Sequence, residues 1–121
     1  MIIALWVINI LLAVAFLGAG AMKLARSKAA LQANGMGYVE DYSAGAVKAI
    51  GAVEILGALG LILPLATGIA TVLTPIAAAG LAITMLLAVL VHARRKESFT
   101  PALILMLLAV VSTVIGFLVV L

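Results

Sequence analysis

Four long apolar runs decide what this chain can fold into. They cover about residues 2–22, 44–64, 69–92 and 101–121, and an α-helix needs roughly 20 apolar residues to cross the hydrocarbon core of a bilayer. Only 9% of the 121 residues are charged, against about 25% in soluble domains, so the chain cannot cover a water-exposed surface with polar groups. The sequence therefore predicts an all-α membrane protein, a single domain of four transmembrane helices packed as a bundle in lipid.

Most charged residues lie in the two segments that an even number of spans places on the same side of the membrane. The basic ones in these segments are Lys23, Arg26, Lys28, Arg94, Arg95 and Lys96. Because basic loops are retained in the cytoplasm, this pattern predicts two cytoplasmic loops and both termini on the non-cytoplasmic side. We expect the bacterial cytoplasmic membrane as the location. The net charge of +3 is thus a topology signal, and no nucleic-acid partner is expected.

The segment between the first two spans carries structure of its own. Residues 27–34 are predicted to form a short interfacial helix, with Ser27 as its N-cap and Asn34-Gly35 as its stop signal. Tyr38 and Tyr42 follow this helix. Tyrosines at this level are typical of the aromatic belt at a membrane interface. A cytoplasmic docking surface is the alternative interpretation.

One ionisable side chain, Glu54, lies well inside the second span. A charged group at the centre of a membrane helix costs about 2.5–3.5 kcal/mol on insertion scales, so such a residue is a functional-site hypothesis with a partner to be found. Its helical neighbours include Gly51, Gly57 and Ala58, a face of small residues that lets another helix approach closely. We therefore expect Glu54 to face the interior of the bundle.

Two basic side chains, Lys23 and His92, end neighbouring spans near the level of Glu54 and are its candidate partners. In the third span Gly80, Thr84 and His92 share one helical face. We expect a functional polar cluster of Glu54, Lys23, His92 and Thr84, with Gly80 as a supporting packing residue. For Glu54 two roles stay open: a structural ion pair, and direct binding of a ligand or proton.

Three further polar side chains, Asn9, Ser112 and Thr113, lie near the middle of their spans. Asn9 is expected to bond between helices. Thr84, Ser112 and Thr113 are expected to donate to carbonyl groups of their own helices. A continuous polar seam that passes through Glu54 toward Thr84 and Ser112 is the alternative.

No metal site and no catalytic set of residues is predicted. One histidine and four scattered carboxylates give no metal-ligand spacing. The absence of cysteine excludes disulfides, thiolate metal sites and thiol–disulfide relay chemistry. No cofactor is identified, and a quinone or a lipid is the candidate ligand. The residues name no reaction, which leans against an enzyme and leaves the question undecided.

Several elements occur in a fixed order along the chain. They are Gly18 to Lys23 closing the first span, Gly37-Tyr38 in the loop, Gly51-x-x-Glu54-x-x-Gly57 in the second span, Pro64, and His92 closing the third. This order resembles the DoxX-like family of small four-helix membrane proteins. The resemblance implies a redox-associated membrane protein, since one relative is a subunit of an archaeal thiosulfate:quinone oxidoreductase and others are parts of membrane oxidoreductase complexes. A more distant eukaryotic relative is a chaperone in receptor assembly. The resemblance also implies that Lys23, Glu54 and His92 are the polar positions typical of the family, and it assigns no catalytic role to them.

Together these features predict an accessory or assembly subunit, chaperone-like in role, of a membrane complex. Its polar site around Glu54 is expected to bind a partner helix, a lipid or a quinone. The expected partners are the bilayer and either another membrane protein or a second copy of the chain. The first alternative is a small transporter of hydrophobic or cationic compounds coupled through Glu54, and the second is an intramembrane enzyme.

Overall fold

The computed structural model describes residues 1–121 and contains helices and no strand. Four of its helices are long and apolar enough to cross a membrane: α1 (Ile2–Ala25), α3 (Ala44–Thr67), α4 (Leu73–Arg94) and α5 (Thr100–Val120). Two short elements lie between α1 and α3: α2 (Lys28–Ala33) and the 3₁₀ helix η1 (Gly37–Asp41). The predicted all-α class with four spans is confirmed.

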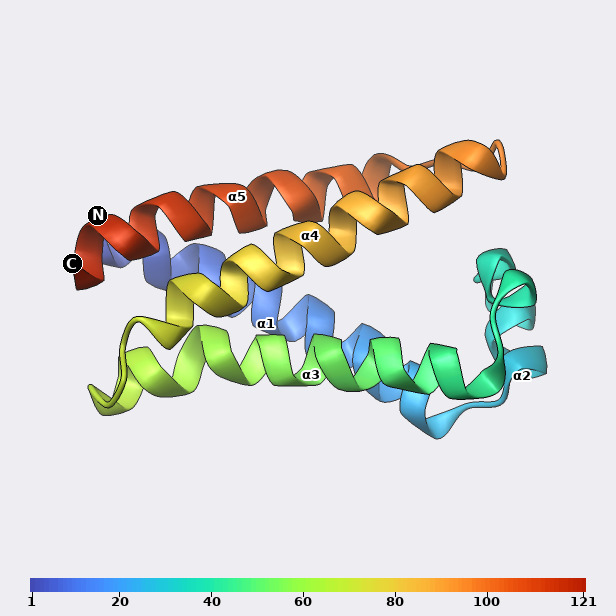
Figure 1. Cartoon of the computed structure of the whole chain (residues 1–121), viewed down its shortest axis with the longest axis horizontal. Helices are drawn as coiled ribbons and strands as arrows, with labels where there is room; N and C mark the ends of the chain where they lie inside the picture. Colours follow the sequence, from blue (N-terminus) through green and yellow to red (C-terminus); the bar gives the residue numbers. More distant parts are fainter.

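The long helices form a bundle in the cyclic order α1, α3, α4, α5 (Figure 1). The most extensive contacts are those between α1 and α3 and those between α4 and α5. Among the four neighbouring pairs, α1 and α5 have the smallest contact. Both termini and the α3–α4 turn lie at one end of the bundle, and α2, η1 and the α4–α5 loop lie at the other. In the view of Figure 1, the α4–α5 pair diverges from α3 toward this loop end.

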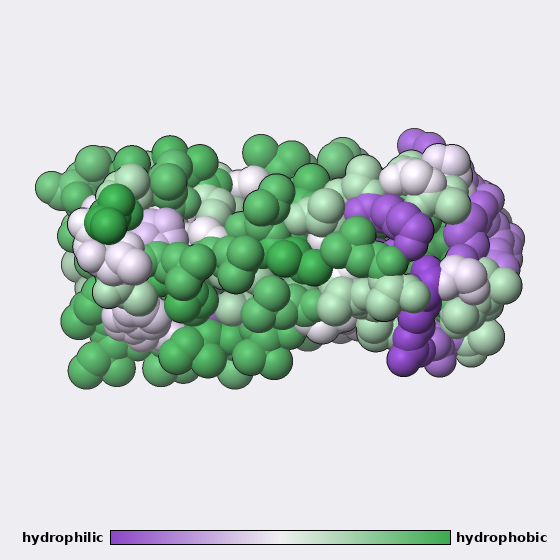
Figure 2. Space-filling view, turned by 90° about the horizontal axis from the view of Figure 1, so that it is seen from below, coloured by the Kyte–Doolittle hydropathy of each residue, from purple (hydrophilic) through white to green (hydrophobic).

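The outer surface of the bundle is apolar. Only 23 of the 121 residues are buried, although 68% are hydrophobic, so most apolar side chains point outward. Figure 2 shows hydrophobic residues over most of one face and hydrophilic residues gathered at one end. Soluble proteins rarely expose so large an apolar area, because water penalises it, whereas lipid chains solvate it. The bundle is therefore built for a lipid bilayer.

Two helix ends depart from the predicted spans because of the turn between them. α3 runs through Pro64 to Thr67 and ends at Gly68, whose φ of 72° forms a left-handed cap. The turn continues through Ala70, also at positive φ, so α4 begins at Leu73 and not near residue 69.

Pro64 lies inside α3 and has no N–H to offer the carbonyl of Gly60 four residues before it. The Thr74 hydroxyl of α4 donates to this Gly60 oxygen at 2.9 Å. An unpaired carbonyl in hydrocarbon costs several kcal/mol, so this bond from the neighbouring helix lets α3 continue past the proline.

Asn9 ties three helices together in the middle of the bundle. Its amide nitrogen donates to the Leu61 carbonyl of α3 at 3.0 Å, and its amide oxygen accepts from the Ser112 hydroxyl of α5 at 2.5 Å. The predicted interhelical role of Asn9 is confirmed, and so is the bond of Thr113 to a carbonyl of its own helix. The expectation that Ser112 bonds its own helix is wrong, because the Asn9 oxygen lies within reach across the α1–α5 contact.

Replacing Asn9 by leucine should lower the free energy of unfolding by about 1–2 kcal/mol, because it breaks two interhelical bonds and leaves Ser112 without its partner. Thermal unfolding in a mild detergent measures the change. Thr113→Val is the matched control, since Thr113 bonds only within α5. Equal loss of stability in the two variants would contradict the bridging role of Asn9.

Candidate functional site

α1 and α3 cross in direct backbone contact at two glycines near the loop end. A Cβ atom placed on Gly20 would lie 2.6 Å from the Gly51 carbonyl oxygen, and one on Gly51 would lie 2.8 Å from the Gly20 oxygen. Only glycine fits both positions. Sequence reasoning selects Gly51 but misses Gly20, whose signal is that it precedes Lys23 by three residues just as Gly51 precedes Glu54.

α1 and α3 run in opposite directions (Figure 1), so Lys23 lies on the loop side of the crossing, beside Gly51, and Glu54 lies on the other side. The long lysine side chain extends along the crossing to reach the carboxylate. Lys23 Nζ donates to Glu54 Oε1 at 2.6 Å. The side chains are only 7% and 2% exposed. Of the two candidate partners of Glu54, the structure thus pairs Lys23 with it. Opposite charges in hydrogen-bond contact offset much of the cost of burying either one.

His92 lies near this pair but bonds elsewhere. Its Nδ1 atom is 3.0 Å from Glu97 Oε1 in the loop after α4, and its ring meets the Tyr38 ring edge-on with centroids 5.3 Å apart. Thr84 donates to the Gly80 carbonyl of its own helix at 2.9 Å. No hydrogen bond links these groups to the Asn9–Ser112 pair, so the continuous polar seam is not formed.

A cavity of about 540 Å³ opens between the four spans at the loop end. All four residues of the predicted polar cluster line it: Lys23, Glu54, Thr84 and His92. Much of the remaining wall is apolar and comes from Ile50, Met85, Leu87, Ala88, Val91 and Leu105. Small-molecule sites in proteins typically measure about 300–1,000 Å³ and combine an apolar lining with a few polar groups. The cavity has the size and character of a ligand site.

The small residues around Glu54 have different roles. Gly57 receives Leu81 of α4, since a Cβ atom there would lie 2.6 Å from a Leu81 methyl carbon. Ala58 is buried in the main apolar core. Gly80 does not pack against a helix as expected: it is exposed, and nothing lies within 4 Å of where its Cβ would be. The reason is the rotation of α4, which turns Leu81 and not Gly80 toward α3.

Tyr38 and Tyr42 line the cavity at its loop end. Their rings meet edge-on with centroids 6.3 Å apart. Burial raises the pKa of Tyr38, and the charge of nearby Lys23 opposes this rise. The Tyr38 hydroxyl therefore stays protonated at neutral pH and can donate a hydrogen bond. Sequence reasoning assigns both tyrosines to the interface and misses their place in the cavity wall.

Arg95 fastens the loop that carries these tyrosines to the α4–α5 loop. Its guanidinium lies 2.8 Å from Asp41, 3.8 Å from Glu40 and 3.2 Å from Glu97. The hydrogen bonds that Arg95 donates to Asp41 and Glu97 raise the pKa of Arg95. The hydrogen bonds that Glu97 accepts, first from His92 and then from Arg95, lower the pKa of Glu97. This cluster joins two loops that are 54 residues apart in the chain, counted from Asp41 to Arg95.

The fold and the cavity define the class of this protein: a small integral membrane protein with four apolar helices and a buried charge pair. Comparison with known families identifies it further. The sequence model of the DoxX-like family matches residues 7–114, and the chain belongs to this family. The resemblance expected from the motif order is thus confirmed. No curated protein and no solved structure matches the chain.

Arg95→Gln should loosen η1, because it removes the contacts to Asp41 and Glu40. Amide hydrogen exchange in residues 36–42 should then speed up by about two- to fivefold, the size expected for an exposed ion-pair cluster. Arg94→Gln is the control, since Arg94 is exposed and forms no ion pair in the structure. Equal exchange in wild type and Arg95→Gln would contradict the fastening role.

The same cluster predicts a pH dependence with a definite sign. The pKa of Glu97 is lowered in the folded protein. The stability that the ionised Glu97 adds to the folded loops is therefore fully present above the ordinary glutamate pKa of about 4.3. It is lost as the pH falls through the lowered folded value. Exchange in residues 36–42, corrected for the intrinsic pH dependence of amide exchange, should therefore rise only on acidification below that range.

Proposed function

We propose that this DoxX-like protein is an accessory subunit of a membrane complex that binds a lipid-soluble molecule, a lipid or a quinone, beside Glu54. One observation carries the proposal: the Lys23–Glu54 pair lies in the wall of a cavity of about 540 Å³. A purely structural pair is best sealed by packed side chains. Here the pair forms the polar part of a cavity whose remaining wall is mostly apolar. A site for an amphiphilic ligand requires this combination.

The size of the cavity favours a small molecule over a partner helix. A helix with its side chains is about 10–12 Å across and rises about 5.4 Å per turn, so a single turn would occupy roughly the whole volume. A partner protein would therefore bind outside the cavity, on the lipid-facing or loop surfaces. An accessory or assembly role then means holding a lipid or quinone for that partner.

A transporter coupled through Glu54 is less well supported. Lys23 already compensates the carboxylate in a contact of 2.6 Å, so Glu54 is not a free acid awaiting a cation. The cavity residues also come from the loop half of the spans, whereas the opposite half is filled by apolar packing and the Asn9 bridge.

Removing both charges of the pair should abolish ligand retention and spare the fold. The double variant Lys23→Met/Glu54→Leu replaces a buried ion pair by apolar groups, a change that is often neutral for stability. Lipid and quinone extraction from purified protein, followed by mass spectrometry, should show at least about tenfold less retained amphiphile than wild type. Thermal unfolding of the double variant should stay close to wild type.

Single variants provide the contrast. Glu54→Gln leaves the Lys23 charge without its counter-charge and should cost about 3–5 kcal/mol of stability on its own. If the double variant retains as much amphiphile as wild type, the proposed binding role is wrong.

We further propose that both basic loops lie in the bacterial cytoplasm and both termini lie outside. The reason is that the hydrophilic residues gather at one end of the molecule (Figure 2), and basic loops are retained in the cytoplasm. Lys48 supports this placement, since its ammonium reaches the Leu24 carbonyl at the end of α1 in the same loop region. Fusions of alkaline phosphatase to either terminus should be active, and cytoplasmic fluorescent reporters should be dark. An active cytoplasmic reporter at either end would overturn this topology.

A further inference from the structure

We infer that the ligand is a neutral, single-chain amphiphile whose head lies against the Lys23–Glu54 pair and whose apolar chain leaves between α3 and α4 past Gly80. The inference rests on the proposed function and adds the class of ligand and the path of its chain. Two independent features carry it: the charge balance of the cavity wall, and an apolar groove on α3 and α4 that lies next to the cavity.

The charge balance concerns the ion pair. Lys23 has three N–H donors; one is used on Glu54 Oε1, and the ammonium also interacts with the Tyr38 hydroxyl. Glu54 lines the cavity, and only its Oε1 atom is bonded to Lys23. The pair therefore offers donors and an acceptor side by side with no net charge. A head that carries a carbonyl or hydroxyl satisfies both. A charged head would leave one charge in the membrane without compensation, which is costly there.

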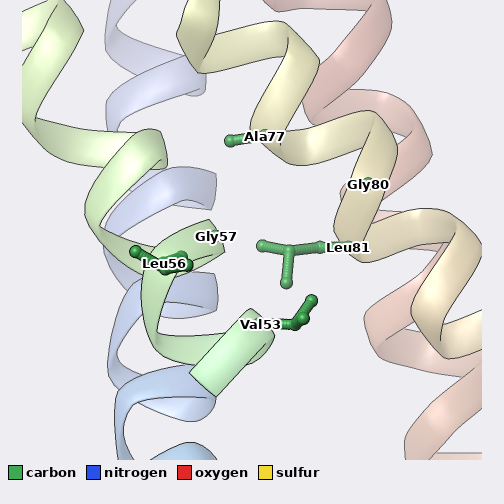
Figure 3. A pocket seen from close by; sticks show the side chains of 6 residues that line it. All are labelled: Val53, Leu56, Gly57, Ala77, Gly80 and Leu81. Atoms are coloured by element: carbon green, nitrogen blue, oxygen red, sulfur yellow. The ribbon is translucent and has the colours of Figure 1, made fainter. Parts of the chain in front are cut away.

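The groove lies on the lipid side of the α3–α4 contact. It has a volume of about 250 Å³ and is lined by Val53, Leu56, Gly57, Ala77, Gly80 and Leu81. Figure 3 shows Leu81 extending from α4 toward Gly57 of α3, with Val53 beside it. Gly80 leaves the α4 side of the groove open, because no atom lies within 4 Å of its Cβ position.

Cavity and groove adjoin on both helices. On α4, the Thr84 hydroxyl in the cavity wall donates to the carbonyl of Gly80 in the groove wall. On α3, Glu54 lies between Val53 and Gly57 within one turn. The groove and the cavity share no lining residue, but on both helices their walls lie within about one turn of each other. A volume of this size cannot accept a helix about 10–12 Å across, whereas a single hydrocarbon chain fits. The groove can therefore take the apolar chain of a molecule whose head lies in the neighbouring cavity.

Photo-crosslinking of the full-length protein in detergent tests the path. The probe is a monoacylglycerol with a diazirine in the middle of its acyl chain, and its charged counterpart is a lysophosphatidic acid with the same chain. We expect the neutral probe to label α3 and α4 peptides that contain Gly57 and Gly80. The anionic probe should label them at least about tenfold less. Competition by unlabelled monoacylglycerol and by a prenyl quinone shows which source of neutral head binds more tightly.

Gly80→Leu fills the groove without a clash at its Cβ and should reduce this labelling by about tenfold. Gly18→Leu is the matched control: Gly18 also has open space around its Cβ position, but on α1 away from the groove. Unchanged groove labelling in Gly80→Leu, or preference for the anionic probe, overturns the inference and leaves the proposed function standing. Equal amphiphile retention by wild type and the Lys23→Met/Glu54→Leu variant instead overturns the proposed function itself.

Discussion

The buried contact between Lys23 and Glu54 is the interaction on which the rest of the site depends. Neither charge is tolerable alone in a membrane helix, and each is made tolerable by the other. Their meeting requires the backbones of α1 and α3 to touch at Gly20 and Gly51, where any side chain would collide with a carbonyl oxygen. The close crossing of α1 and α3 thus makes the ion pair possible, and the ion pair makes the cavity wall polar.

The cavity exists because the bundle is packed unevenly along its length. At the end with the termini, apolar residues and the Asn9 bridge fill the space between the helices. At the loop end the α4–α5 pair diverges from α3 (Figure 1), and the space is closed by the tyrosines near η1 and by the contacts of Arg95. The polar groups of the cavity wall therefore lie at the loop end of the interior, the geometry that an amphiphile with a short head needs.

Polar groups inside the spans are satisfied by neighbouring helices wherever their own helix fails to satisfy them. The Thr74 hydroxyl donates to the Gly60 carbonyl that Pro64 leaves without a partner, and the Ser112 hydroxyl donates to the Asn9 amide oxygen. Glu54 is the exception, because its second carboxylate oxygen has no bond within the protein. Because Glu54 lines the cavity, this remaining acceptor is available to the ligand that we propose for the cavity.

The sequence by itself determined the four helices, since the transfer of an apolar run into lipid is a local property of that run. It also identified Glu54, because a charge among apolar residues is visible without a fold. Only the tertiary structure decided that Lys23 and not His92 contacts Glu54, that Ser112 bonds Asn9, and that Gly80 opens a groove where Gly20 closes a crossing. Those outcomes depend on how far each helix is rotated and where it crosses its neighbour, quantities that no single span encodes.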